Sequence, residues 1–91
     1  MSINAVFEAL AHPVRRKILR LLRAGPLSAG EIAAHFDLTK PTLSSHFNKL
    51  KQAELVAAER RGTSLIYHAN TSILEEAVAG LLELKEKSHD P

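Results

Sequence analysis

Residues 28–52 read SAGEIAAHFDLTKPTLSSHFNKLKQ, and this stretch predicts two short helices joined by a tight turn. Ser28 and Glu31 have the spacing of a capping box, which predicts a helix from about Ser28 to His35. Thr39 is a favourable N-cap residue for a second helix, and Pro41 fits the first turn of that helix. Two short helices with only residues 36–38 between them are typical of a helix-turn-helix motif.

The second of these helices has an unusual outer side. Leu43, Phe47 and Leu50 share one face at helical spacing, and we expect them to pack on the core. Most other positions hold hydroxyl, amide or basic side chains, and no Asp or Glu occurs between Asp37 and Glu54. Such groups read base edges in the major groove of DNA, where an acid would be repelled by phosphate. A polar helix that only faces water is the alternative.

The rest of the chain predicts short elements on both sides of this motif. The order α-α-α-α-β-β-α describes a mainly α protein with a small β-hairpin, a winged helix-turn-helix, and we expect it to form one domain over residues 1–91. A second capping box, Ser72 with Glu75, predicts the start of the last helix. The other expected elements are helices over Asn4–Ala11 and Pro13–Ala24, strands over Leu55–Arg60 and Leu65–Ala69 around a polar loop at 61–64, a helix end near Lys87 and a frayed end at 88–91.

Composition narrows the class of protein. The chain has 91 residues, is 45% apolar and contains no cysteine, which excludes disulfides and cysteine zinc sites and fits a reducing cytosol. Its first residues lack the pattern of a signal peptide, and its apolar runs are too short to span a membrane. We therefore expect a cytoplasmic, nucleoid-associated protein with no membrane insertion.

Charge is unevenly distributed along the sequence. Residues 1–51 hold eight Lys or Arg against three Asp or Glu, whereas residues 52–91 hold four against seven. A basic front half suggests an anionic partner such as double-stranded DNA, although solvated helical faces would give the same imbalance. The cluster Arg15-Arg16-Lys17 is most simply a solvated face of the second helix, with contact to DNA or to an acid of a partner chain as alternatives.

The predicted DNA contacts lie on the outer side of the second motif helix and at the hairpin. Residues in the first turns of such a helix are best placed to reach bases. His46 is divided between two interpretations, because it flanks the core face and could either pack there or touch DNA. The predicted contacts are Lys40, Thr42 and Ser45 to bases, Asn48 and Lys49 to the DNA backbone, Ser44 and His46 on the flanks, and Arg60, Arg61 and Thr63 at the hairpin.

Three segments resemble a known family when they are taken together. They are ALAHPVRRKILRLL (9–22), LSAGEIAAHFDLTKPTLSSHFNKLKQAELV (27–56) and RRGTSLIYH (60–68). The chain resembles the ArsR/SmtB family of bacterial winged-helix regulators over roughly residues 5–82, and within it the small SdpR-like autorepressor branch. The resemblance implies a homodimeric repressor that binds an inverted-repeat operator and dimerises through its first and last helices.

The last helix supports a dimer independently of this resemblance. Its apolar residues cover close to half of its circumference, which is more than one small core needs. A single deeply buried helix is the alternative. The expected dimer contacts are Val6, Phe7 and Leu10 of the first helix and Leu74, Val78, Leu81 and Leu82 of the last helix.

The ligands of the family's metal sensors are not matched. Those sensors use a cysteine motif on the helix that here reads EIAAHFDL, and Asp, His and Glu on the last helix, which here has no histidine before His89. We therefore expect no metal site and no cofactor. A metal- or ligand-responsive regulator of the same family and a protein-interaction module are the alternatives. An enzyme is not expected, because no catalytic set and no glycine-rich phosphate loop occurs.

Overall fold

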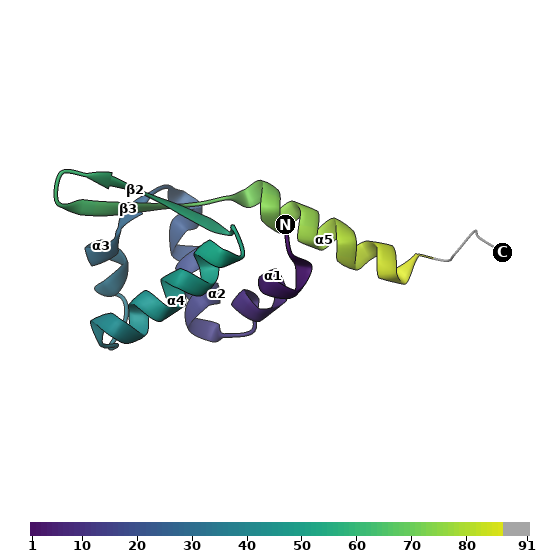
Figure 1. The fold of residues 1–91 in the computed structure, drawn as a ribbon, viewed down its shortest axis with the longest axis horizontal. Helices are drawn as coiled ribbons and strands as arrows, with labels where there is room; N and C mark the ends of the chain where they lie inside the picture. Colours follow the sequence, from purple (N-terminus) through teal and green to yellow (C-terminus); the bar gives the residue numbers. More distant parts are fainter. Residues whose placement is uncertain (87–91) are drawn as a thin grey trace.

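The computed structural model describes residues 1–86 and confirms the predicted order of helices and strands (Figure 1). The tip of the hairpin and the start of α4 lie at one end of the molecule, and α5 extends away from them at the other end. Lys87 and the predicted frayed end, 88–91, lie outside the described residues. The elements are α1 (Ile3–Leu10), α2 (Pro13–Leu21), the 3-10 helix η1 (Leu22–Ala24), β1 (Leu27–Ser28), α3 (Ala29–Ala33), α4 (Lys40–Gln52), β2 (Val56–Arg61), β3 (Ser64–Ala69) and α5 (Thr71–Lys85).

The hairpin is longer and its loop tighter than the sequence predicted. β2 and β3 pair antiparallel as far as Arg61 and Ser64, so only Gly62 and Thr63 form the loop. Gly62 has a φ of 60°, a left-handed conformation that glycine adopts at no steric cost in two-residue hairpin loops. The predicted loop over 61–64 was therefore too wide. The short strand β1, which the sequence did not predict, pairs with β3 and completes a sheet of order β1-β3-β2.

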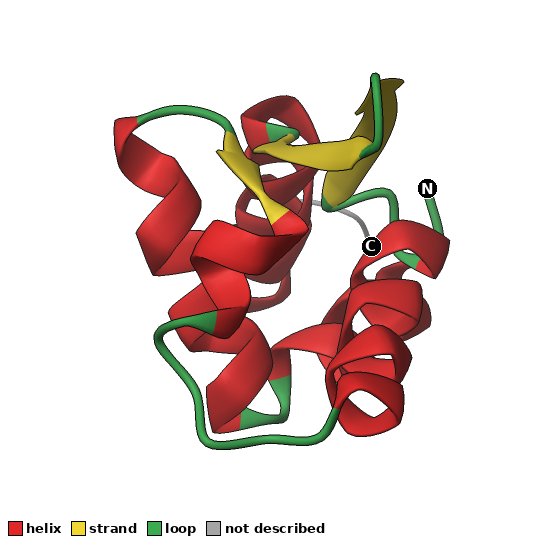
Figure 2. Cartoon of the chain, turned by 90° about the vertical axis from the view of Figure 1, so that its left-hand side faces the viewer, coloured by secondary structure: helices red, strands yellow, loops and turns green. Residues whose placement is uncertain are grey.

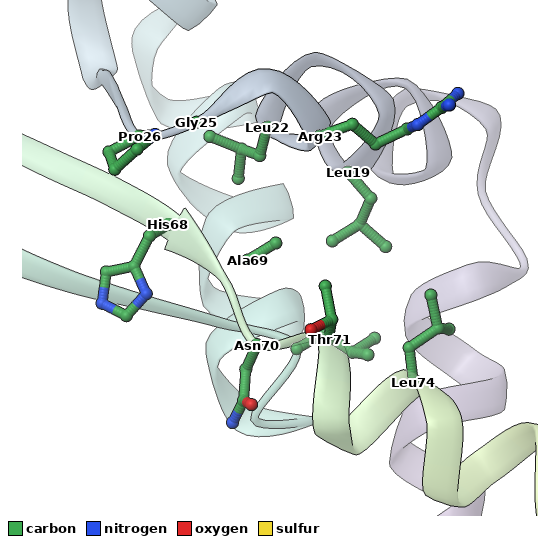
Figure 3. Close-up of a pocket in the computed structure, with 11 residues that line it drawn as sticks. Leu19, Leu22, Arg23, Gly25, Pro26, His68, Ala69, Asn70, Thr71 and Leu74 are labelled. Carbon is green, nitrogen blue, oxygen red and sulfur yellow. The ribbon is translucent and has the colours of Figure 1, made fainter.

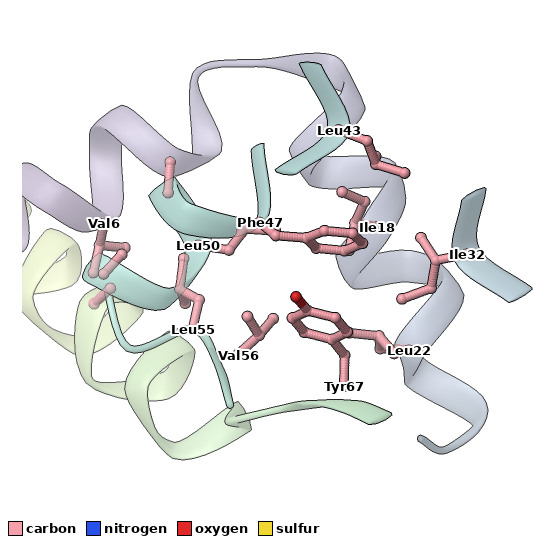
Figure 4. Packing of buried hydrophobic residues seen from close by; sticks show 13 residues of the cluster. Val6, Ile18, Leu22, Ile32, Leu43, Phe47, Leu50, Leu55, Val56 and Tyr67 are labelled. Carbon is pink, nitrogen blue, oxygen red and sulfur yellow. The ribbon is translucent and has the colours of Figure 1, made fainter. Parts of the chain in front are cut away.

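The core lies between the helices and the strands, with the helices gathered on one side of the sheet (Figure 2). Ile18, Ile32 and Leu50 are fully buried and come from three different helices. The rings of Phe47 on α4 and Tyr67 on β3 stack with centroids 4.2 Å apart (Figure 4). Each such side chain contributes about 1.5–3 kcal/mol by leaving water. This packing fixes α4 against the sheet and orients its other side outward.

Side-chain caps mark the starts of α3 and α4, as predicted. Ser28 Oγ accepts a hydrogen bond from the Glu31 amide at 3.0 Å, and Glu31 Oε1 accepts one from the Ser28 amide at 2.8 Å. The bond from the Ser28 amide, followed by the effect of the Ser28 side chain, stabilises the ionised carboxylate and lowers the pKa of Glu31. Thr39 Oγ1 accepts from the Thr42 amide, which confirms Thr39 as the N-cap residue of α4.

The predicted capping box at Ser72 and Glu75 is wrong. The N-cap residue of α5 is Asn70, and its side chain accepts no amide of the helix. The Asn70 amide donates to the Leu55 carbonyl at 2.9 Å, which fixes the chain where β3 ends and starts the helix directly afterwards. Ser72 therefore lies inside the first turn, where its hydroxyl donates to Asn70 Oδ1.

Only part of the basic cluster Arg15-Arg16-Lys17 is the solvated face that the sequence suggested, because Arg15 is buried whereas Arg16 is exposed and Lys17 is half-buried. Arg15 and Arg16 donate to main-chain carbonyls at the C-terminal end of α1, and Lys17 donates to a carbonyl just after the end of α3. Positive charge there also complements the helix dipole. The bonds are Arg15 to Ala9 O (2.7 Å) and Glu8 O (2.9 Å), Arg16 to Leu10 O (2.7 Å), and Lys17 to His35 O (3.2 Å).

Candidate DNA interface

The outer side of α4 presents the groups that the sequence predicted. The core-facing side holds Leu43, Phe47 and Leu50, all buried, so the helix cannot turn without exposing them. The side chains opposite them are exposed hydroxyl, amide and ammonium groups, and α4 contains no acid. The predicted contact residues that α4 exposes are Lys40, Thr42, Ser44, Ser45 and Asn48.

The hairpin adds a second exposed polar surface near the start of α4 (Figure 1). Arg60, Arg61 and Thr63 are all exposed at or next to its tip. Arg61 also forms an ion pair with Glu59, whose carboxylate lies 2.8 Å from Nη2. An exposed pair of this kind is worth about 0–1 kcal/mol, so it leaves Arg61 available to a phosphate. The sequence prediction did not include this neighbouring acid.

His46 lies on the core side of α4 and is only 9% exposed. Its Nδ1 is 3.0 Å from Nη1 of Arg15, and its ring centroid is 4.4 Å from that of His12. Burial, with smaller contributions from His12 and Arg15, lowers the pKa of His46. Of the two interpretations of His46, the structure therefore favours packing. His46 helps to position α4 and is not among the exposed residues that could contact DNA.

Lys49 is half-buried and does not point freely into solvent. Its ammonium group pairs with the carboxylate of Glu8 on α1. This contact and the positive charge of Lys49 lower the pKa of Glu8. A phosphate would have to compete with Glu8 for Lys49, so the predicted backbone contact requires an exchange of partners.

Four of the seven predicted dimer residues are exposed apolar side chains, two are half-buried and one is buried. Val78, Leu81 and Leu82 of α5 are 47%, 46% and 53% exposed, and Phe7 of α1 is 39% exposed. Leu10 and Leu74 are half-buried. Val6 is fully buried within its own chain, so its assignment to a dimer contact was wrong.

An apolar hollow of about 270 Å³ lies between α2 and the start of α5 (Figure 3). Leu19, Leu22 and Leu74 point into it, whereas the side chains of Arg23 and His68 point away. No polar groups converge there as they would in a catalytic site. Within residues 1–86, no three His, Asp or Glu side chains are grouped so that they could hold a metal ion. No helix in the same range is long and apolar enough to cross a membrane.

Comparisons with known proteins agree with this geometry. A family model described as a helix-turn-helix domain matches residues 10–58. The transcriptional repressor SdpR of Bacillus subtilis is 44% identical over 85 residues, which cover 93% of this chain and 94% of that protein. An arsenical resistance operon repressor of Staphylococcus aureus is 33% identical over 80 residues, which cover 88% and 77%. The crystal structure of an ArsR family transcriptional regulator matches with a TM-score of 0.85 at 28% identity and covers 90% of both chains.

These relatives are named as transcriptional regulators and not as enzymes. Their matches span both the helix-turn-helix and the hairpin, the two parts that present the exposed polar groups described above. The chain therefore belongs to the ArsR family of DNA-binding, winged helix-turn-helix transcriptional regulators.

Proposed function

We propose that this regulator is a repressor that binds an inverted-repeat operator as a homodimer. The observation that carries the proposal is the outer side of α4, which is acid-free and lined with short hydrogen-bonding side chains. Groups such as Ser45 and Asn48 can contact base edges at close range, and Lys40 adds charge at the start of the helix. The names of the two similar proteins, both repressors, favour repression over activation.

Val78, Leu81 and Leu82 form an exposed apolar stripe on α5, and this stripe supports the homodimer. A two-fold axis through this stripe would pair equivalent leucines of two copies and remove them from water. Such a dimer has two α4 helices, and successive major grooves on one side of DNA lie about 34 Å apart. An inverted repeat with half-sites about 10 base pairs apart is the corresponding operator.

Selection of bound DNA from a random pool by the intact chain tests both parts of this proposal. We expect an inverted repeat whose half-sites are separated by about one helical turn. A pool without any enriched sequence would refute specific DNA reading. Enrichment of a single half-site would instead refute the symmetric dimer while leaving DNA reading intact.

Two substitutions then separate base contacts from phosphate contacts. Ser45→Ala should relax the preference at one base pair by about 1–3 kcal/mol, whereas Arg61→Ala should weaken binding to all sequences and reduce the salt slope by about 1. Ser72→Ala and Arg23→Ala are the matched controls, because both residues are exposed and lie outside α4 and the hairpin. If Ser45→Ala and Arg61→Ala change affinity and preference alike, the assignment of the two surfaces is wrong.

A further inference from the structure

Arg15 is a buried cation that connects three helices. It lies on α2 and is only 9% exposed. Its Nε and Nη2 donate to the carbonyls of Ala9 and Glu8 at the end of α1, at 2.7 and 2.9 Å. Its Nη1 lies 3.0 Å from Nδ1 of His46 on α4. One planar guanidinium therefore fixes the end of α1 and the middle of α4 in a single geometry.

The partners of Arg15 are unusual for a buried charge. Buried cations are normally paired with carboxylates, but none of the ion pairs found within residues 1–86 includes Arg15. The negative end of the α1 dipole and a neutral imidazole take the place of an acid. An apolar side chain would fill the same space, but it would not set the angle between the helices. The planar guanidinium holds its N–H donors in fixed directions, so its hydrogen bonds do set the angle between the helices.

The contact also requires one protonation state of His46. A guanidinium only donates, so Nδ1 of His46 must be unprotonated and accept. The charged and titratable groups around this ring are Arg15 and His12 from α2 and its N-cap, Glu8 from α1, and Lys49 one turn along α4. Glu8 is already paired with Lys49, so the groups nearest His46 oppose a proton on its ring. A proton on Nδ1 would break the contact with Arg15.

We propose that Arg15 and His46 are positioning residues that set the angle of α4 on α1, and that DNA recognition requires this angle. α1 packs against α5 and also carries the exposed Phe7, so the same contact links the reading helix to the helices proposed for dimerisation. In a dimer, a change of angle at each α4 would alter the fit of both helices to their half-sites together. The inference rests on the proposed function and identifies residues that control it without touching DNA.

The test uses two substitutions of His46 that have nearly the same shape. Asn places an amide oxygen close to the position of Nδ1 and cannot gain a proton, whereas Leu has no acceptor. We expect His46→Leu to reduce the ratio of affinities for selected and random DNA about ten-fold, and His46→Asn to retain it. Arg15→Met should cause the same loss, and the double variant Arg15→Met/His46→Leu should lose no more than either single variant.

The pH dependence provides a readout that simple packing would not change. Between about pH 8 and pH 5, the ratio for the parent chain should fall, because a protonated His46 cannot accept from Arg15. When other histidines become charged at low pH, affinity should rise for selected and random DNA alike, so this general gain drops out of the ratio of the two affinities. His46→Asn should show a flat profile, and His68→Gln, a change at an exposed histidine of the hairpin, should behave like the parent.

The possible outcomes separate this inference from the proposed function. If the parent chain enriches no sequence, the proposed function fails and this inference fails with it. If the parent enriches a sequence and His46→Leu retains the full ratio, only this inference is overturned. A loss of ratio in His46→Asn equal to that in His46→Leu would also overturn it, because the accepting atom would then be irrelevant. If Arg15→Met does not fold, the comparison of His46→Leu with His46→Asn still decides the inference.

Discussion

Leu82 gives the most direct test of the proposed homodimer. It is 53% exposed on α5, in line with the exposed Val78 and Leu81. Burying a whole leucine side chain is worth about 1.5–3 kcal/mol, so burying the exposed half is worth about 1 kcal/mol. A two-fold interface uses each residue twice, which doubles this to about 2 kcal/mol for the dimer. Leu82→Ala should therefore raise the dimer dissociation constant about thirtyfold.

Sedimentation velocity over a range of protein concentrations measures this constant directly. The control is Glu83→Ala, because Glu83 is exposed on α5 but lies outside the apolar stripe. Circular dichroism of both variants would show whether α5 remains helical. A dissociation constant for Leu82→Ala within about threefold of the parent's would refute the reasoning, since the stripe would then face water in the dimer as well.

Three further predictions concern stability. Ile32→Ala should lower the free energy of unfolding by about 2–5 kcal/mol in urea titrations, because Ile32 is fully buried in the core. Ser28→Ala should cost about 1 kcal/mol through loss of the capping box at α3, whereas Ser64→Ala on the exposed hairpin should cost less. Burial, followed by His12 and Arg15, holds the pKa of His46 below its ordinary 6.5, so the unfolded chain binds a proton more readily than the folded chain. Stability should therefore fall as the pH decreases below 6.5, and His46→Asn should flatten this part of the stability curve.

Local patterns predicted most of the fold. The capping box at Ser28, the N-cap Thr39 and the apolar face of α4 each depend on residues within a few positions of one another. Their energetics are therefore contained in the local sequence. The extent of strand pairing in the hairpin was predicted less well. The position at which pairing stops depends on the left-handed conformation of Gly62. The strand β1 has only two residues, too few to produce a pattern.

The predictions that failed depend on contacts between distant parts of the chain. Arg15 looks like an ordinary surface arginine in sequence, and its burial requires His46, 31 positions away, and the end of α1. The start of α5 depends on Asn70 bonding to Leu55 across the sheet, so a correct capping pattern at Ser72 was misleading. The outer side of α4 could be predicted without such contacts. The absence of acids between Asp37 and Glu54 can be read from the sequence, whether or not these residues are known to be exposed.

The short helix α1 connects these distant contacts to the proposed DNA recognition. Three of its eight residues face different surroundings: Val6 packs in the core, Glu8 pairs with Lys49 on α4, and Phe7 is exposed. The pair between Glu8 and Lys49 is exposed and contributes little by itself. The bond of Arg15 to the Ala9 carbonyl is buried, and loss of the contact would remove this donor and leave a buried charge without its acceptors at the end of α1. If a DNA phosphate takes Lys49 from Glu8, the buried contact is therefore the polar link between α1 and α4 that would remain beside their apolar packing.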